Sequence, residues 1–137
     1  MVSLEAVRRR LNKFEEYLAL LERIRGYSQE EFIADQERYG SAEWFLQLAI
    51  EALTDLGNYV IAERQLGVVD LGSDIPAIFH QQGHVEDELR QRWVRMLGFR
   101  NVLVREYLDI HRKIVHEVLQ HQLGDLRSLA RVFARYL

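Results

Sequence analysis

The sequence predicts an all-α protein built as an up-and-down helical bundle, and three observations lead to this fold class. Apolar residues recur at spacings of three and four over most of the chain, as on one face of a helix. Sustained alternation of apolar and polar residues, the pattern of a half-buried strand, is missing. The 137 residues include one proline and eight glycines, which leaves little room for long loops. We therefore expect packed helices and no β-sheet.

The length predicts a single domain that spans residues 1–137. Apolar residues make up 48% of the chain and charged residues 28%, which is ordinary for a globular protein with a core of its own. No internal repeat is visible. We expect one helical domain without a second module.

The first helix is expected from Ser3 to about Ile24. Ser3 is a suitable N-cap, and Gly26 ends the helix. Residues 28–31, Ser-Gln-Glu-Glu, form a capping box that predicts a second helix through about Arg38. We expect Gly40-Ser41 to break the chain after it. The apolar face of the first helix comprises Leu4, Val7, Leu11, Phe14, Leu18 and Leu21.

A long central helix is expected over residues 41–65. Trp44 and Leu53 widen its apolar face. Asp55 and Asn58 lie within it, and their side chains either face solvent or line a cleft shared with the motif described below. The remaining apolar positions of this face are Phe45, Leu48, Ala52, Leu56 and Val60.

The second half of the chain predicts a loop and four shorter helical segments. A loop over residues 67–74 leads into a short helix from Pro76 to about Gly83. The acidic residues 86–88 favour the first turn of the next helix, in which Gly98 marks a kink or a tight helix contact.

Two further helices complete the expected bundle. Asp109 is the expected N-cap of a helix that carries Ile110, Ile114, Val115, Val118 and Leu119. Gly124-Asp125 is expected to separate it from a last helix, with Leu126, Leu129, Val132 and Phe133 on its apolar face.

Charge is distributed unevenly over a chain whose net charge is −3. Residues 1–89 carry 8 Lys/Arg and 17 Asp/Glu, a balance of −9, whereas residues 90–137 carry 10 and 4, a balance of +6. A basic segment opposite an acidic one suits nucleic acid or an acidic partner. No run is apolar and long enough to cross a membrane, no N-terminal leader is apparent, and cysteine is absent, so we expect a cytoplasmic protein without disulfides.

The most specific stretch is the decapeptide 98–107, Gly-Phe-Arg-Asn-Val-Leu-Val-Arg-Glu-Tyr. In a helix, the rotation of about 100° per residue places Arg100 and Tyr107 at nearly the same angle around the axis. Asn101 and Arg105, four residues apart, form the neighbouring row. One edge of this helix would therefore present two cations, an amide and a phenol, a set that could hold a phosphodiester.

This pattern resembles the R-x-x-x-x-H-x-Y signature of the HepT-type HEPN toxins, small all-helical ribonucleases of prokaryotic toxin–antitoxin pairs. The resemblance covers essentially the whole chain. It implies metal-independent cleavage of RNA, either tRNA or mRNA, with Arg100 as the cation and Asn101 orienting the phosphate. It also implies a homodimer in which two motifs meet in one cleft. A nucleotidyltransferase-like antitoxin would attach AMP to Tyr107, which otherwise reads as an aromatic residue packed at a helix end.

Arg105 stands where the family has its catalytic histidine. Arginine stays charged at neutral pH and cannot exchange a proton there. Either this is a natural divergence that leaves a phosphate-binding protein of little or no activity, or it is a change that inactivates a toxic nuclease. In both cases catalysis should suffer, since losing a general acid or base costs about 10²–10⁴ in rate.

Two other functions compete with the ribonuclease. One is a non-catalytic HEPN-like binding partner of a nucleotidyltransferase, and the other is a helical dimer without a role in RNA chemistry. The histidines predict no metal site: His111, His116 and His121 are spaced by five, and Gly83 interrupts the helix that would present His80 and His84. We expect no cofactor.

Overall fold

A computed structural model describes residues 2–105 and 111–136, without the side chains of Arg105 and His111, and confirms the all-α prediction. This part of the chain contains helices and no strand. The helices are α1 (Leu4–Arg25), α2 (Gln29–Ala34), α3 (Gln36–Arg64), α4 (Asp74–Gln81), α5 (Asp87–Arg105), α6 (His111–His121) and α7 (Leu123–Ala134).

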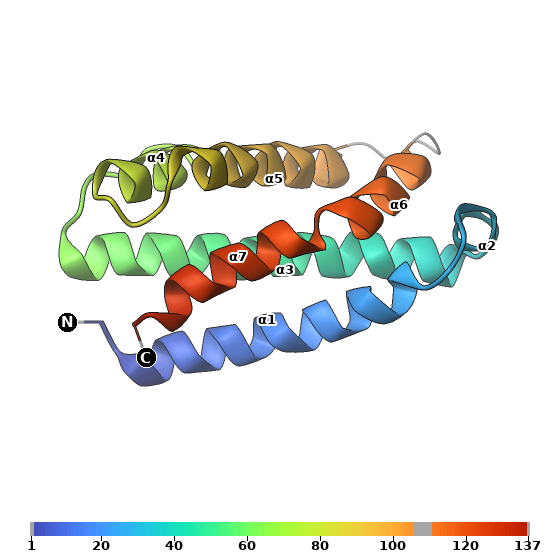
Figure 1. Cartoon of the computed structure of the whole chain (residues 1–137), viewed down its shortest axis with the longest axis horizontal. Helices are drawn as coiled ribbons and strands as arrows, with labels where there is room; N and C mark the ends of the chain where they lie inside the picture. Colours follow the sequence, from blue (N-terminus) through green and yellow to red (C-terminus); the bar gives the residue numbers. More distant parts are fainter. Residues whose placement is uncertain (1, 106–110, 137) are drawn as a thin grey trace.

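The long helix α3 lies at the centre of the bundle (Figure 1). It runs antiparallel to α1 along the length of the molecule, and α5 returns along its other side. The short helix α4 packs on α3 and α5, and α6 and α7 cover α1, α3 and each other. One core of apolar side chains from all these helices holds them together.

The N-terminal predictions are confirmed at the level of individual caps. The Ser3 hydroxyl accepts a hydrogen bond from the backbone N–H of Ala6 at 3.2 Å, and α1 begins at Leu4, directly after this cap. Ser28 and Glu31 form both bonds of a capping box, each between a side chain and a backbone N–H. The predicted apolar face of α1 is buried except at Leu4, which is 49% exposed.

The predicted break at Gly40-Ser41 is wrong. α2 ends at Ala34, and Asp35 starts α3 by adopting an extended backbone and accepting a hydrogen bond from the Glu37 N–H at 2.9 Å. Gly40 and Ser41 then lie inside α3. Glycine in a helix costs only about 1 kcal/mol relative to alanine, which the tertiary contacts of a 29-residue helix can outweigh.

The side chain of Trp44 does not widen the apolar face of α3 as predicted, because it is 54% exposed. The buried face of this helix is rotated by about one residue from the predicted apolar face, so that Trp44 lies on the solvent side. Its members are Ala42, Leu46, Ala49, Ile50, Leu53, Leu56, Gly57, Val60 and Ile61.

The tight helix contact occurs at Gly57, and the prediction of a tight contact at Gly98 is wrong. α5 continues through Gly98, where an added Cβ would meet no atom within 4 Å. A Cβ on Gly57 would lie 2.7 Å from Cγ2 of Ile75 and 3.1 Å from Cη2 of Trp93. Glycine thus lets α4 and α5 approach α3 closely at one point.

The last helix begins earlier than predicted, at Leu123, and the break falls at Gln122. Gly124 and Asp125 lie inside its first turn. The predicted cap Asp109 lies outside the described residues.

Helix α6 is tied to the turn between α1 and α2 by polar contacts. Nε2 of the buried His116 lies 3.2 Å from the carbonyl oxygen of Tyr27. The side-chain amide of Gln120 donates to the carbonyl of Arg25 at 2.9 Å, and Arg25 donates to the carbonyl of Gln120 at 3.1 Å. His116 is therefore a structural histidine, which holds in place the helix that follows the motif.

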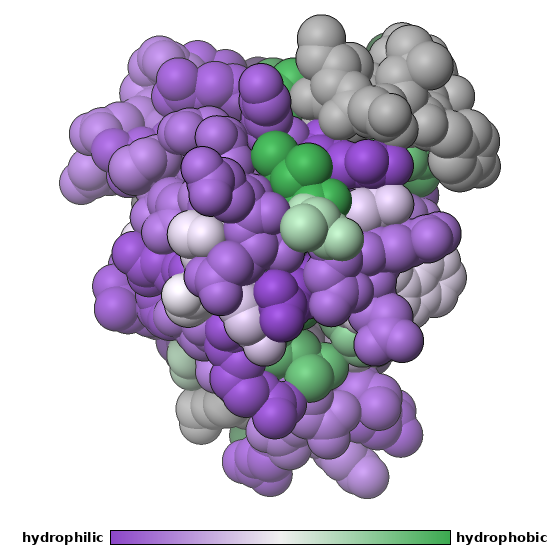
Figure 2. Space-filling model, turned by 90° about the vertical axis from the view of Figure 1, so that its right-hand side faces the viewer, coloured by the Kyte–Doolittle hydropathy of each residue, from purple (hydrophilic) through white to green (hydrophobic). Residues whose placement is uncertain are grey.

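The end of the bundle seen in Figure 2 is hydrophilic apart from small, separate apolar areas. No helix in the described ranges is both long and apolar enough to span a membrane.

We predict opposite effects of the same substitution at two glycines of α3. Gly57→Ala should lower the free energy of unfolding by about 1–3 kcal/mol, because the new methyl group overlaps Ile75 and Trp93. Gly40→Ala meets no atom within 4 Å and should raise it by about 0.5–1 kcal/mol, because alanine is the better helix former. Urea unfolding followed by circular dichroism measures both. Equal effects at the two sites would show that Gly57 is not a packing contact.

Candidate functional site

The site is centred on Arg100, which α5 presents toward α3. Nε of Arg100 donates to Oε1 of Glu51 at 2.9 Å, and Nη2 donates to the same carboxylate. The two side chains are about one-third exposed. Glu51 thereby fixes the plane of the guanidinium, and it is itself approached by the amide of Gln47 at 3.5 Å.

Asn101 holds the other end of the same guanidinium. Its Oδ1 accepts a hydrogen bond from Nη1 of Arg100 at 3.3 Å. Arginine has five N–H groups, and Glu51 and Asn101 engage three of them. Within the described part of the chain, two N–H groups remain for a ligand. They could donate to the oxygens of a phosphodiester.

A cavity of about 560 Å³ adjoins Arg100 and Asn101. Three parts of the chain line this cavity. They are α3, which contributes two carboxylates, the segment before α4, and one side of α5. This volume lies in the range of small-molecule and nucleotide pockets. Its other lining residues are Ile50, Glu51, Thr54, Asp55, Leu71, Gly72, Ser73, Val94, Leu97 and Gly98.

Asp55 stands at the rim of this cavity, one helical turn after Glu51. The sequence left open whether Asp55 faces solvent or a cleft shared with the motif, and the structure places it at the boundary: the residue is exposed but also lines the cavity. Partial burial raises the pKa of the Asp55 carboxyl above its ordinary value of 3.8, and the charge of Glu51 raises it further. Arg10 and Arg100 act in the opposite direction.

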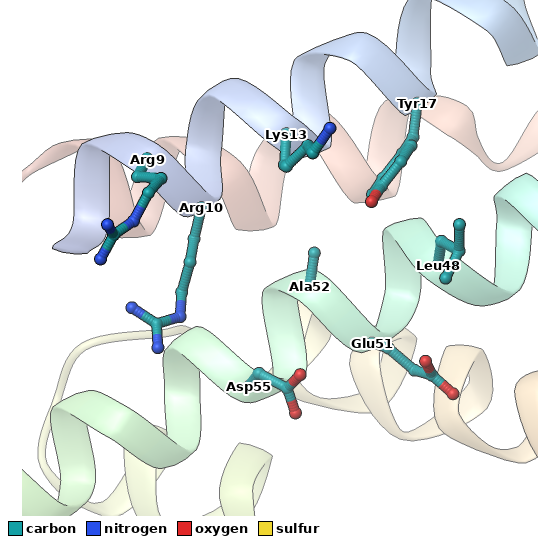
Figure 3. Close-up of a pocket in the computed structure, with 8 residues that line it drawn as sticks. All are labelled: Arg9, Arg10, Lys13, Tyr17, Leu48, Glu51, Ala52 and Asp55. Carbon is teal, nitrogen blue, oxygen red and sulfur yellow. The ribbon is translucent and has the colours of Figure 1, made fainter.

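A second, smaller cavity of about 240 Å³ lies on the other side of Asp55, between α1 and α3 (Figure 3). Arg9, Arg10 and Lys13 project into it from α1. Figure 3 shows Arg10 extending toward the side of α3 that carries Asp55, and Glu51 directed away from α1. Glu51 and Asp55 line both cavities, so they form a ridge between the cations of α1 and the cation of α5.

The structure thus brings together two of the four residues that the sequence singled out. Arg100 and Asn101 share one hydrogen-bonded cluster. α5 ends at Arg105, but the side chain of Arg105 is not among the described parts of the chain. Tyr107 lies wholly outside the described residues. Sequence reasoning missed Glu51. No local signal could have identified it, because its contact with Arg100 spans 49 positions of the chain.

The histidines form no metal site among the described residues, where no group of three potential ligands occurs. Nδ1 of His80 lies 3.0 Å from the carbonyl oxygen of Val85, and the ring of His84 packs against Phe79 and Tyr136. His121 is exposed beside Glu117. The side chain of His111 is outside the described part of the chain.

The model of the family described as "Ribonuclease HepT-like" matches residues 14–133. A relative described as "mRNA nuclease HepT", from Shewanella oneidensis (strain ATCC 700550 / JCM 31522 / CIP 106686 / LMG 19005 / NCIMB 14063 / MR-1), is 30% identical over 87 residues. The alignment covers 64% of this chain and 65% of the relative, so it spans slightly less than two thirds of the relative's length.

Solved structures share the whole fold. A tri-AMPylated HEPN toxin of Shewanella oneidensis, in complex with an MNT antitoxin, superposes with a TM-score of 0.86 at 23% identity and covers 94% of this chain and 96% of its own. YutE, a cytosolic protein of unknown function from Bacillus subtilis, superposes with a TM-score of 0.83 at 19% identity and covers 99% and 91%. At these identities the similarity establishes the fold alone.

Because the pKa of Asp55 is raised, we predict that replacing it with asparagine stabilises the folded protein, and that this gain grows with pH. The folded state holds the Asp55 proton more tightly than the unfolded state, so this contribution to stability is complete below pH 3.8 and is lost as pH rises through the folded pKa. Asp55→Asn should therefore become more stable than the natural chain as pH increases. Urea midpoints from about pH 4 to about pH 8 measure the difference.

Glu30→Gln is the control, because it removes an exposed carboxylate from α2 at the far end of the bundle. It should show no such trend. A constant difference between Asp55→Asn and the natural chain over the whole pH range would contradict a raised pKa.

Proposed function

The chain belongs to the HepT-like ribonuclease family, and we propose that it is an RNA-cleaving HEPN toxin whose activity is impaired by Arg105. The observation that carries the proposal is the arrangement around Arg100. A fixed guanidinium with two remaining N–H groups stands beside an amide and a cavity of about 560 Å³. Such a group can stabilise the negative charge that develops on the non-bridging phosphate oxygens during attack by a 2′-hydroxyl.

The proposed reaction is metal-independent transesterification. The 2′-oxygen loses its proton and bonds to phosphorus, and the bond from phosphorus to the 5′-oxygen breaks. Arg100 would donate to the non-bridging oxygens, and Asn101 would orient the phosphate. The family's histidine would exchange protons with the attacking or leaving oxygen, a role that Arg105 cannot fill. The name of the curated relative makes mRNA the first substrate to test.

We infer a homodimer in which two copies of the motif face one cleft. Exposed apolar side chains on α5 support this, since Val94 is 36% exposed and both Val102 and Val104 are 39% exposed. Leu71, at the rim of the cavity, is 68% exposed. A second copy could cover these apolar side chains and contribute a second Arg100 to the cleft.

We further propose control by a nucleotidyltransferase-like antitoxin that adenylylates Tyr107. Support comes from the related complex of an AMPylated HEPN toxin with an MNT antitoxin. An AMP group on the motif edge would place a negative charge and a bulky base beside Arg100. This would block access of RNA to the guanidinium. RNA and ATP are both available in the cytoplasm, where we place the protein.

The second candidate is a non-catalytic partner of the nucleotidyltransferase, and the observation that favours it is Arg105 itself. An arginine at this position preserves phosphate binding while removing proton transfer. The two functions differ in whether restoring an imidazole restores cleavage.

We predict that Arg105→His cleaves RNA about 10²–10⁴ times faster than the chain with Arg105, because it supplies the missing general acid or base. Incubation with mRNA and tRNA in EDTA, followed by gel electrophoresis, measures this. Arg105→Gln is the matched control, because it removes the positive charge without adding a group that titrates near neutrality. Adding Arg100→Ala to Arg105→His should abolish cleavage. If Arg105→His is inactive, the binding-partner function replaces the ribonuclease.

We predict that the natural chain gains the mass of one or more AMP groups when it is incubated with its antitoxin, Mg²⁺ and ATP. Tyr107→Phe should gain none, because it lacks the acceptor oxygen. Intact-protein mass spectrometry measures the gain. Modification of Tyr107→Phe to the same extent would move the acceptor to another residue.

A further inference from the structure

Asp55 shares the cavity of Arg100 but takes no part in holding it. It lies four residues after Glu51, on the same face of α3. No described residue donates a hydrogen bond to its carboxylate. In contrast, Oε1 of Glu51 accepts from two nitrogens of Arg100 and lies within reach of Gln47. Of the two carboxylates at the site, Asp55 is the one whose oxygens remain available to a substrate.

The charges around Asp55 come from three helices. Glu51 is on its own helix, Arg10 lies on α1 and Arg100 on α5. The segment before α4 lines the cavity with the uncharged residues 71–73. Burial is the largest influence and raises the pKa of the carboxyl, which makes Asp55 a better proton acceptor than a fully solvated aspartate. Arg9, another cation of the adjoining cavity, can hold a neighbouring phosphate, whereas Lys13 is paired with Glu16 at 3.2 Å.

We propose that Asp55 is a catalytic residue, the general base that accepts the proton of the attacking 2′-hydroxyl. This rests on the ribonuclease function proposed above. In the step, the 2′-O–H bond breaks and its proton passes to a carboxylate oxygen of Asp55. The freed electron pair forms the bond from the 2′-oxygen to phosphorus. The bond from phosphorus to the 5′-oxygen breaks, and that oxygen takes a proton from water in the natural chain.

The lining of the cavity suits the nucleotide that this step requires. Arg100 and Asn101 can hold the phosphate at one end, and Asp55 stands at the rim on the opposing helix. Apolar side chains, including Ile50, Val94 and Leu97, also line the cavity and can contact a ribose or a base. A base on α3 and a cation on α5 would therefore approach one phosphodiester from two sides.

The assignment explains what Arg105 removes. With Asp55 as base, an imidazole at position 105 would be the acid that protonates the leaving oxygen. The chain with Arg105 then keeps its base and its cation and lacks only the acid. We therefore expect slow cleavage of RNA by this chain, with a residual activity that depends on Asp55.

The test measures single-turnover cleavage of a 5′-labelled single-stranded RNA in EDTA, from about pH 4.5 to about pH 9. The natural chain and Arg105→His are each compared with and without Asp55→Asn. Asp55→Glu serves as the conservative variant, and Glu30→Gln removes a carboxylate outside the cavity. RNA affinity from fluorescence anisotropy and thermal unfolding are recorded for each protein, so that defects in binding or folding are recognised.

We expect Arg105→His to give a bell-shaped profile, with an acid limb from Asp55 and an alkaline limb from the introduced imidazole. Adding Asp55→Asn should lower the rate about 10²–10⁴-fold and remove the acid limb, without weakening RNA binding. Asp55→Glu should keep the acid limb, and Glu30→Gln should change neither limb. In the natural chain, Asp55→Asn should abolish the residual cleavage.

Three results would overturn the proposal. Cleavage by Arg105→His that survives Asp55→Asn with its acid limb intact would exclude Asp55 as the base and leave the ribonuclease function standing. A lower rate with an unchanged acid limb would reduce Asp55 to a structural role. Absence of cleavage in every protein that retains Asp55 would remove the ribonuclease function, and the assignment of Asp55 with it.

Discussion

The close approach of α3, α4 and α5 at Gly57 sets the geometry on which the site depends. Ile75 and Trp93 fill the space that a side chain at position 57 would occupy. From this contact, Glu51 lies six residues back along α3 and Arg100 lies seven residues after Trp93 along α5. The two helices run antiparallel, so these offsets of about 9 Å and about 10.5 Å point in the same direction. Glu51 and Arg100 therefore lie opposite each other and can form an ion pair, because the contact at Gly57 fixes the two helices about two turns away.

Periodicity and capping chemistry were sufficient to predict the helices. Glycine was a less reliable sign of a helix end: Gly26 caps α1 as predicted, but other glycines expected to interrupt a helix lie inside one. Ser3 and the Ser28–Glu31 box act through their own neighbours in sequence, so their caps could be read directly. Whether a glycine ends a helix depends on what surrounds it. Gly40 and Gly98 continue their helices, whereas Gly57, buried in the middle of α3, is the one that permits close packing. Tertiary contacts decide among these cases, and the sequence contains no local record of them.

The same distinction applies to the site. Arg100 and Asn101 are adjacent in sequence, and a motif on one helix was enough to place them on one edge. Glu51 reaches them from another helix, and its pairing with Arg100 also explains part of the charge asymmetry. The acidic first part of the chain neutralises cations of the basic second part through Glu51 with Arg100 and through Glu22 with Arg127. The separation of charge along the sequence therefore overstates the positive potential available to RNA.

This pairing constrains how Arg100 can act. A guanidinium bound to a carboxylate carries little net charge toward a distant phosphate, so it adds little to the salt-dependent attraction that dominates nucleic-acid affinity. Its two remaining N–H groups act at short range, on oxygens that gain negative charge as the 2′-oxygen bonds to phosphorus. Arg9 of α1, which is exposed beside the adjoining cavity, is better placed to supply attraction to the ground state. Different cations would then serve binding and catalysis. Arg100 would interact mainly with the transition state, and this interaction raises the rate of cleavage.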